Sequence, residues 1–418
     1  MNAPASASVR RGACPGLSAP MATGDGLLAR LTPAGSTVPL NAFTGLCVAA
    51  RIHGNGIVEI TSRGSIQIRG LSDASAPLFT ADVASLGIEA SDGIPVVTDP
   101  LAGLCRHDRF DANALATEIR TVVAAAPFAA RLSAKVSVVV DGGGVLHLDA
   151  LAADIRLRAI GGAHVHAALA GDAAAATPLG AVPMGRAVEC VIRLFETLAA
   201  RAPRSRMRDA IQGEELSAFR SAIADLIVDF PLPAARRAAD PIGIHRLSSN
   251  DNALGVGLPF GHSDSEALSR LVAAAREAGA VGVRTAPGRT LLLLGVSAGV
   301  TRNLIAAAGA LGFIVNPADP RRRVVACAGA PICASGEIAA RAMAPAMADV
   351  ARLLPDGEIV HVSGCAKGCA HPAPAPLAVF GRDRRCDVFV EGEMTCSVTA
   401  DELPKHMAQL VSLRGASR

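Results

Sequence analysis

The chain has 418 residues, half of them hydrophobic, and a net charge of only +3. It contains neither Trp nor Tyr and only 11 Phe, which argues against recognition of single-stranded nucleic acid by stacking. No stretch has the character of a signal peptide or a membrane span, and ten cysteines in this length fit a reducing compartment. We therefore expect a cytoplasmic protein of several compact domains, with no nucleic-acid or membrane partner.

The first part of the chain predicts a small domain containing a hairpin. Residues 1–24, rich in Ala, Ser, Gly and Pro, are expected to form an arm. A strand over 26–31 and a helix over 40–50 follow, and then two alternating segments surround Arg63. On the second segment Gln67 and Arg69 share one face, which leaves a polar face for a ligand. An exposed edge hairpin with protective charges is the structural alternative.

The middle of the chain predicts a second, larger domain. Helical spacing runs over 112–126, and the β-branched run before Asp141-Gly-Gly-Gly144 predicts a hairpin with residues 145–149. The remaining expected elements, in chain order, are a strand over 154–159, a linker over 167–183, helices over 187–201 and 208–227, and a connector over 231–241.

The last part of the chain repeats the first. Its strand, helix and hairpin, with Arg289 standing where Arg63 stood, predict a pseudo-two-fold repeat with arginines from both halves at one pocket. The expected elements are a strand over 252–260, a helix over 265–278, a hairpin over 281–294, helices over 337–354 and 400–413, and strands over 359–363, 377–380 and 387–390.

Four cysteines in two pairs suggest a metal centre. Cys327 and Cys333 are separated by five residues, and Cys365 and Cys369 by three. Structural zinc takes pairs with two to four residues between them, so the first pair is too long, whereas an iron-sulfur cube accepts unequal loops. Ordinary buried cysteines are the structural alternative. The other six cysteines are scattered singly, and we interpret them as buried or incidental.

This spacing resembles the cluster motif of the sirohaem-dependent nitrite and sulfite reductases and of their relatives, the precorrin-3B synthases. The segment Thr61-x-Arg63-x3-Gln67 is similar to a tetrapyrrole-site motif of that superfamily, and 10–15 is similar to the opening of the synthases. Lys135 matches the first of two substrate-gripping lysines of the reductases, but Ser137 replaces the second. An Arg-Asn pair expected near Ile94 is also missing. The loss of positive charge argues against reduction of sulfite or nitrite, because a small oxyanion needs it. The synthase branch is therefore favoured.

The resemblance implies an α+β fold, a pseudo-two-fold repeat of ferredoxin-like half-domains and of reductase-type 4Fe-4S α/β domains. The expected divisions are an N-terminal arm over 1–24, a ferredoxin-like half-domain over 25–80, an α/β domain over 81–166, a linker and helices over 167–240, a second half-domain over 241–318 and a 4Fe-4S domain over 319–418. It further implies hydroxylation of precorrin-3A at C-20 by O2 with γ-lactone formation, in cobalamin biosynthesis.

The same resemblance implies the site and its cofactors. A 4Fe-4S cluster would be held by Cys327, Cys333, Cys365 and Cys369, with Cys369 toward the tetrapyrrole. The residues expected to bind substrate carboxylates are Arg63, Gln67, Arg69, Lys135, Arg284, Arg289 and Lys367. Electrons would come from NADH through a separate reductase or ferredoxin, because the chain has no dinucleotide-binding fingerprint. A mononuclear non-haem iron is also implied; its ligands are unassigned, and His53, His107, His361 and His371 are available, each with a plain structural role as the alternative.

Two other functions stay open at this point. A sirohaem-dependent nitrite or sulfite reductase is the alternative enzyme, and bound sirohaem would identify it. A cluster protein that only carries electrons is the non-enzymatic alternative. The arginine-rich double hairpin speaks against a carrier, since a carrier needs no such pocket.

Overall fold

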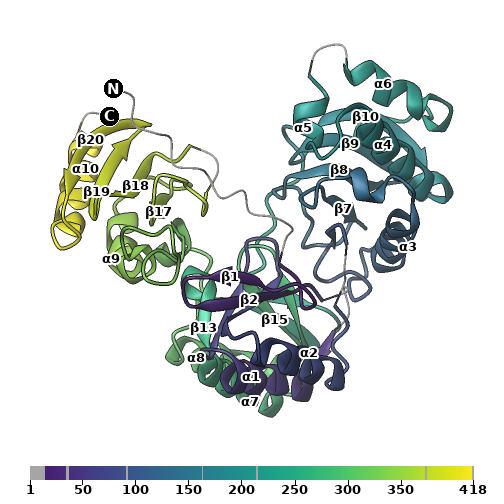
Figure 1. The fold of residues 1–418 in the computed structure, drawn as a ribbon. Helices are drawn as coiled ribbons and strands as arrows, with labels where there is room; N and C mark the ends of the chain where they lie inside the picture. The colour runs from purple at the N-terminus through teal and green to yellow at the C-terminus, as the bar shows by residue number, and fades with distance from the viewer. Residues whose placement is uncertain are drawn as a thin grey trace. The chain divides into compact units, whose positions relative to one another are not determined.

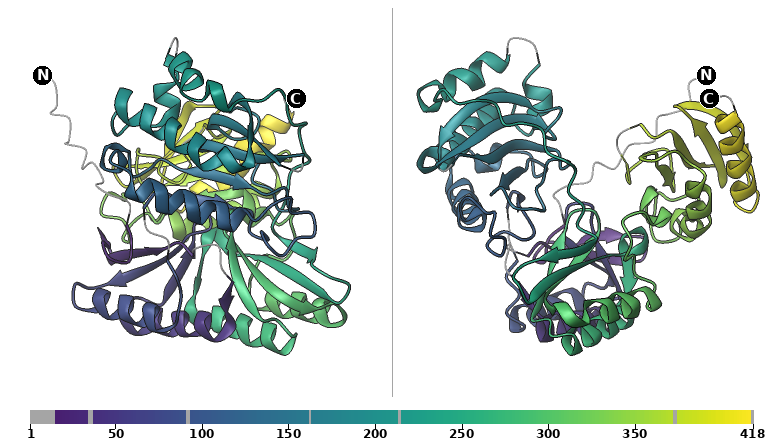
Figure 2. Two further views of the ribbon diagram at one scale, coloured as in Figure 1. Left: turned by 90° about the vertical axis from the view of Figure 1, so that its right-hand side faces the viewer. Right: turned by 180° about the vertical axis from the view of Figure 1, so that it is seen from behind.

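The computed structural model describes residues 15–33, 37–90, 93–161, 163–212, 215–371 and 374–416. The expectation for residues 10–15 falls, apart from Pro15, outside this part of the chain. The described residues form two compact units: unit 1 contains those within 15–21 and 93–239, and unit 2 contains those within 22–90 and 240–416. The paths of both are traced in Figures 1 and 2. Within the described ranges, no helix has the length and apolarity needed to cross a membrane.

Unit 2 contains two half-domains, each a five-stranded sheet with helices. The sheet orders are β1-β2-β5-β4-β13 and β11-β12-β15-β14-β3. The first half-domain is built from β1 (Met21–Thr23), β2 (Gly26–Leu31), α1 (Leu40–His53), β4 (Ile57–Ile60), β5 (Ile66–Leu71) and α2 (Ser75–Ser85). The second is built from β11 (Gly243–Arg246), β12 (Asp251–Gly257), α7 (Ser265–Glu277), β14 (Gly282–Ala286), β15 (Thr290–Ser297) and α8 (Thr301–Ala310).

The half-domains exchange their outermost strands. β13 (His262–Asp264) follows β12 in the chain but pairs with β4, and β3 (Val38–Pro39) precedes α1 but pairs with β14. The turns of the two hairpins also touch, since the amide of Gly288 donates to the carbonyl of Ser62 (3.0 Å). The expected repeat is therefore confirmed, and reciprocal strand exchange makes the halves one body.

The remainder of unit 2 is an α/β domain. Its sheet has the order β16-β17-β18-β19-β20, in which the first three strands are parallel and the rest antiparallel. The elements are β16 (Val324–Ala326), α9 (Ala340–Arg352), β17 (Val360–Ser363), β18 (Leu377–Arg382), β19 (Arg385–Val390), β20 (Glu393–Val398) and α10 (Leu403–Ala416). Apolar residues of α9, such as Met347, pack with Val360 and Val362 of β17 in a continuous buried core.

Unit 1 repeats this α/β topology. Its sheet order is β10-β9-β8-β7-β6, in which β6, β7 and β8 are parallel, while β9 and β10 continue the sheet by antiparallel pairing. The elements are β6 (Val96–Thr98), α3 (Ala112–Ala125), β7 (Val138–Asp141), β8 (Ala153–Ile160), β9 (His164–Gly171), β10 (Thr177–Pro183), α4 (Ala187–Arg201), α5 (Met207–Ala210) and α6 (Leu216–Ala222). An α+β fold with both kinds of domain duplicated is thus confirmed.

Three expectations for unit 1 are wrong. Residues 145–149 form no strand, because β7 pairs in parallel with β6 and β8 and the chain leaves it through a loop. The expected linker over 167–183 is mostly β9 and β10; small buried side chains such as Ala167 and Ala181 hide the alternation of a strand. The expected helix over 208–227 is broken into short helices, with a bend at Ile211 and Gln212.

Candidate metal centre and arginine-lined cavity

The four cysteines of the two pairs gather at one edge of the unit 2 sheet. Cys327 directly follows β16, and Cys365 lies two residues after β17; the carboxyl ends of parallel neighbours meet at the same edge. Burial raises the pKa of the Cys365 thiol, and the charges of Cys369, Cys333 and Cys327 raise it further. The sulfurs of Cys327, Cys333 and Cys369 are therefore all within electrostatic reach of Cys365.

Close backbone packing shapes the loops that carry these thiols. A Cβ on Gly364 would lie 2.7 Å from the Cα of Gly329, so only glycine fits there. The amide of Gly364 donates to the sulfur of Cys327 (3.0 Å), a bond of the kind that tunes thiolate ligands. In the described part of the chain, no three His, Cys, Asp or Glu side chains lie close enough to hold a single metal ion. Thiolates are the usual ligands of iron-sulfur clusters, so the four cysteines have the right chemistry for one.

Two of the four candidate histidines lie beside this centre. His361 on β17 is 2% exposed, and its Nε2 has no hydrogen-bond partner. Its ring packs edge-on against His371 (centroids 5.9 Å apart), and burial together with His371 lowers its pKa to about 4. His53 instead hydrogen-bonds Asp82 (2.8 Å), and His107 belongs to unit 1. The structure thus brings only His361 and His371 together.

An arginine-lined cavity of about 420 Å³ opens between the second half-domain and the segment that leads into β16. Its arginines are Arg289, Arg321, Arg322 and Arg323. Arg321 is held by Asp319 (2.7 Å), and Arg322 by Asp240 (2.7 Å). Arg323 donates to the carbonyl of Leu354 (3.0 Å) and precedes Cys327 by four residues. The cavity is therefore basic, and the segment that forms part of its wall leads into Cys327.

Arg289 differs from the other arginines of the cavity. It has a φ of +63° at the hairpin turn, and its side chain lies over Gly261, where a Cβ would meet the Arg289 Cδ at 2.7 Å. Burial lowers the pKa of its guanidinium, although Glu59 opposes that shift. It donates no hydrogen bond to any described residue, so its fork is available for an anionic group.

The other residues that were expected to bind the substrate lie on different elements and differ in their exposure and partners. Arg63 lies at the β4–β5 turn, Arg284 donates to the hydroxyl of Thr37 (3.0 Å), and exposed Lys367 donates to Ser335 (3.1 Å). Lys135 is exposed on the loop before β7 in unit 1.

Arg69 and Gln67 are interior residues, so the expected ligand-facing surface is wrong for them. Arg69 is 5% exposed and binds both carboxylate oxygens of Asp25 (2.9 and 3.0 Å). Gln67, with its amide nitrogen toward Glu59, donates to that carboxylate (3.0 Å) and accepts from Arg30. Partners distant in sequence cover the polar side of the hairpin.

Glu59 is a buried polar residue that sequence reasoning missed. It is 8% exposed, lies 3.9 Å from Arg69 and accepts a hydrogen bond from Arg341 near the start of α9. This ion pair ties the first half-domain to the α/β domain that carries the cysteines. An acid in an apolar strand was the available signal, since such a residue is seldom buried without a partner.

Unit 1 contains a counterpart of the cysteine loops. Val96 pairs with Val138 as Val324 pairs with Val360, so the two sheets are in equivalent register. The loop hydrogen bonds recur as well: Asp108 to Cys105 (3.0 Å) matches Gly336 to Cys333 (2.7 Å), and Arg109 to Gly142 (2.8 Å) matches Glu337 to Gly364 (2.6 Å). Counted from the strand ends, the four cysteine positions are occupied in unit 1 by Asp99, Cys105, Gly143 and His147.

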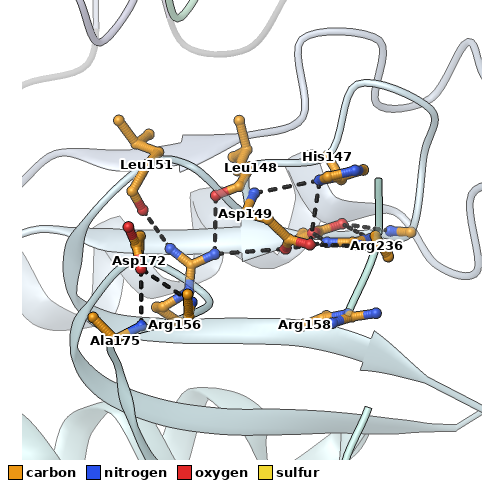
Figure 3. A network of polar contacts seen from close by, with 12 residues as sticks. His147, Leu148, Asp149, Leu151, Arg156, Arg158, Asp172, Ala175 and Arg236 are labelled. Atoms are coloured by element: carbon orange, nitrogen blue, oxygen red, sulfur yellow. Dashed lines mark hydrogen bonds and ion pairs between the residues drawn. The ribbon is translucent and has the colours of Figure 1, made fainter. Parts of the chain in front are cut away.

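Ion pairs connect the loops of this counterpart. Figure 3 shows Arg236 beside Asp149, which it binds through its Nε (2.9 Å). Arg236 also binds Asp141. Arg156 donates to the carbonyl of Leu148 (2.9 Å), and His147 bonds the carbonyl of Arg237 (2.8 Å). The connector that begins at residue 231 thereby lies across the carboxyl ends of β7 and β8. The guanidinium of Arg236 bridges Asp141 at the end of β7 and Asp149 in the loop that follows.

No family model matches the chain, but known proteins and solved structures are similar to it over most of its length. A precorrin-3B synthase from Sinorhizobium sp. is 37% identical over 92% of this chain and 84% of its own length. Sulfite reductase [ferredoxin] 2 from Mycolicibacterium paratuberculosis is 26% identical over 78% of this chain and 64% of its own. The solved structure of the NirA protein of Mycobacterium tuberculosis has a TM-score of 0.75 at 20% identity, covering 92% of this chain and 80% of NirA.

Proposed function

Because this chain belongs to the precorrin-3B synthase family, a family of oxidoreductases within the nitrite and sulfite reductase superfamily, we propose that it makes precorrin-3B in cobalamin biosynthesis. In the proposed reaction one atom of O2 becomes a hydroxyl at C-20 of precorrin-3A, and the ring A acetate closes a γ-lactone at C-1. The second oxygen atom leaves as water with two electrons and two protons. NADH supplies the electrons through a separate protein.

One observation carries the proposal: the cysteine loops and a basic cavity are joined through a single short segment of chain, Arg321–Cys327. The four cysteines would hold a 4Fe-4S cluster, which supplies single electrons when it is bound. A substrate with a carboxylated rim matches the cavity, since an arginine fork pairs with carboxylate in a bidentate manner. We also propose a mononuclear non-haem iron for the reaction with O2, and we assign no ligands to it.

The residues of the chain have distinct tasks in this scheme. Arg289, whose guanidinium is buried and donates to no described residue, binds a substrate carboxylate and thereby orients the macrocycle. Arg63 belongs to the hairpin turn that touches the Arg289 turn, which supports a role for Arg63 at the same ligand. Arg321, Arg322 and Arg323 hold the cavity wall and raise its positive potential.

Purification without oxygen, followed by an absorption spectrum and extraction of any tetrapyrrole, tests the proposal first. An iron-sulfur band without sirohaem is expected, and precorrin-3A with O2 and a reductant should yield a product heavier by one oxygen atom. Stoichiometric sirohaem, with reduction of sulfite or nitrite, would overturn the assignment in favour of a reductase.

The variant Arg289→Gln tests the substrate site itself. We expect its affinity for precorrin-3A to fall about tenfold or more, because a charge-assisted bond to a carboxylate contributes about 1.5 to 3 kcal/mol. Iron content should not change. The matched control is Arg276→Gln on the exposed surface of α7, which should bind precorrin-3A normally. Equal affinity in both variants would remove Arg289 from the site.

A further inference from the structure

We propose that the β18–β19 turn, Arg382-Asp-Arg-Arg385, together with the exposed part of the cysteine loops, is the docking surface for an acidic protein that donates single electrons. This inference rests on the proposed function, since it assigns the entry point of the electrons that the reaction consumes. It commits to one occupant, a small redox protein with a negative surface around its own centre.

The turn is connected to the cysteine loops by direct contacts. The backbone of Gly381 packs so closely on the carbonyl of Gly364 that a Cβ there would lie 2.3 Å from that oxygen. The amide of Gly364, in turn, donates to the sulfur of Cys327 (3.0 Å). On the other side of the turn, the amide of Asp383 donates to the carboxylate of Glu337, which precedes α9 (2.6 Å). A protein bound at the turn therefore lies next to the thiol loops.

The charge of the turn fits an acidic partner. Arg382, Arg384 and Arg385 are exposed, and Lys367 adds a fourth exposed cation on the cysteine loop. Arg385 is anchored to the carbonyl of Ser397 (2.7 Å), and Arg382 lies 3.4 Å from Asp387. Arg384 contacts no partner in the described residues; with a φ of +62° it stands at the tip of a tight turn. These four exposed cations outnumber the exposed acids beside them, Asp383 and Glu337. Such a local excess of positive charge attracts an acidic protein and accelerates its association.

Several exposed residues of the cysteine loops are small or apolar. The exposed residues of the cysteine loops include Pro331, Ala334 and Ala366, and Cys369 is exposed as well. An apolar centre within a charged rim is the usual anatomy of a protein interface, and small side chains let a partner approach closely. A cluster held by the four cysteines would accept one electron and the donor protein would be oxidised by one electron, with no bond made or broken.

Binding of an acidic 2Fe-2S ferredoxin to the cluster-loaded full chain tests the inference without reference to turnover. At low salt, Arg384→Glu combined with Arg385→Glu should weaken binding at least tenfold, and Arg384→Glu alone, which leaves the anchor to Ser397 intact, should weaken it severalfold. Both losses of affinity should become smaller in 0.5 M NaCl, because the salt then screens the attraction between exposed charges beyond a few ångströms. The control Arg276→Glu should change nothing.

Each outcome separates this inference from the proposed function. Equal affinity of the wild type and the double variant, or an equal loss in the control, overturns the docking surface even if a small chemical reductant still reduces the protein. A salt-sensitive loss confined to the turn variants supports the docking surface. Absence of any iron-sulfur absorption band would instead overturn the proposed function.

Discussion

Replacing Asp99 by Asn should stabilise unit 1 at alkaline pH. Asp99 is 1% exposed; its Oδ1 accepts from the amide of Leu101 (2.8 Å), and its Oδ2 has no hydrogen-bond partner. Burial, with added repulsion from Asp141 and Asp108, raises the pKa of this carboxyl to about 7. Asn keeps the bond to Leu101 and places an uncharged amide where the carboxylate oxygen lay.

The magnitude follows from the two pKa values. The carboxyl has an ordinary pKa of 3.8 and a folded-state pKa of about 7, and each pKa unit is worth about 1.4 kcal/mol, so the whole effect approaches about 4 kcal/mol. Between these values the folded state binds more protons than the unfolded state, so stability falls as the pH rises and levels off above about 7. The gain from Asp99→Asn should therefore be about 2 to 4 kcal/mol at pH 8 and vanish near pH 4.

Hydrogen exchange measures this effect locally, which matters because the chain has neither Trp nor Tyr as an optical probe. The exchange of β7 amides, corrected for intrinsic rates, reports the opening free energy of unit 1. Asp209→Asn, on an exposed side chain of α5, is the control and should be neutral at every pH. An Asp99→Asn protein that exchanges as fast as the wild type at pH 8 would refute the reasoning.

Two further changes test the metal centre and its support. Cys333→Ser should abolish most of the iron content and the iron-sulfur absorption band, whereas Cys396→Ser, a thiol bonded to His406, should leave both unchanged; retained iron in the first variant would contradict the ligand set. Arg341→Met should destabilise unit 2 by about 3 kcal/mol in thermal melting, because it leaves Glu59 buried without that partner. The exposed Arg352→Met is its control, and equal melting of the two would argue against the ion pair.

The sequence predicted best where the pattern is local. The alternation around Arg63 and the apolar spacing over 187–201 correspond to β4–β5 and α4, and the second cysteine pair follows a strand, β17, as expected. Periodicity did not reveal the strands within 167–183. Alanines occupy both buried and half-buried positions there, so the alternation of apolar and polar residues that marks a strand is missing.

Partners far apart in the chain explain the errors at the site. The guanidinium of Arg69 is paired with the carboxylate of Asp25, which lies 44 residues earlier in the chain. A local sequence pattern does not reveal a pair so far apart. The Asp-Gly signal after β7 failed for a related reason: Asp141 binds Arg236 from the connector instead of starting a hairpin. The half-domain repeat was visible because its elements keep their order, whereas the correspondence of Asp99 and Cys327 became visible only through strand register.

In unit 1, the positions that correspond to the four cysteines are mostly occupied by other residues, and this affects how much iron the protein needs. Only one of the two equivalent sheet edges keeps four cysteines, so the proposed cluster would be bound once per chain. Arg236 already links Asp141 and Asp149, and this half of the protein has no need of iron to close its loops. Under iron limitation, unit 1 should still mature fully, and the apoprotein would wait for a cluster at a single place.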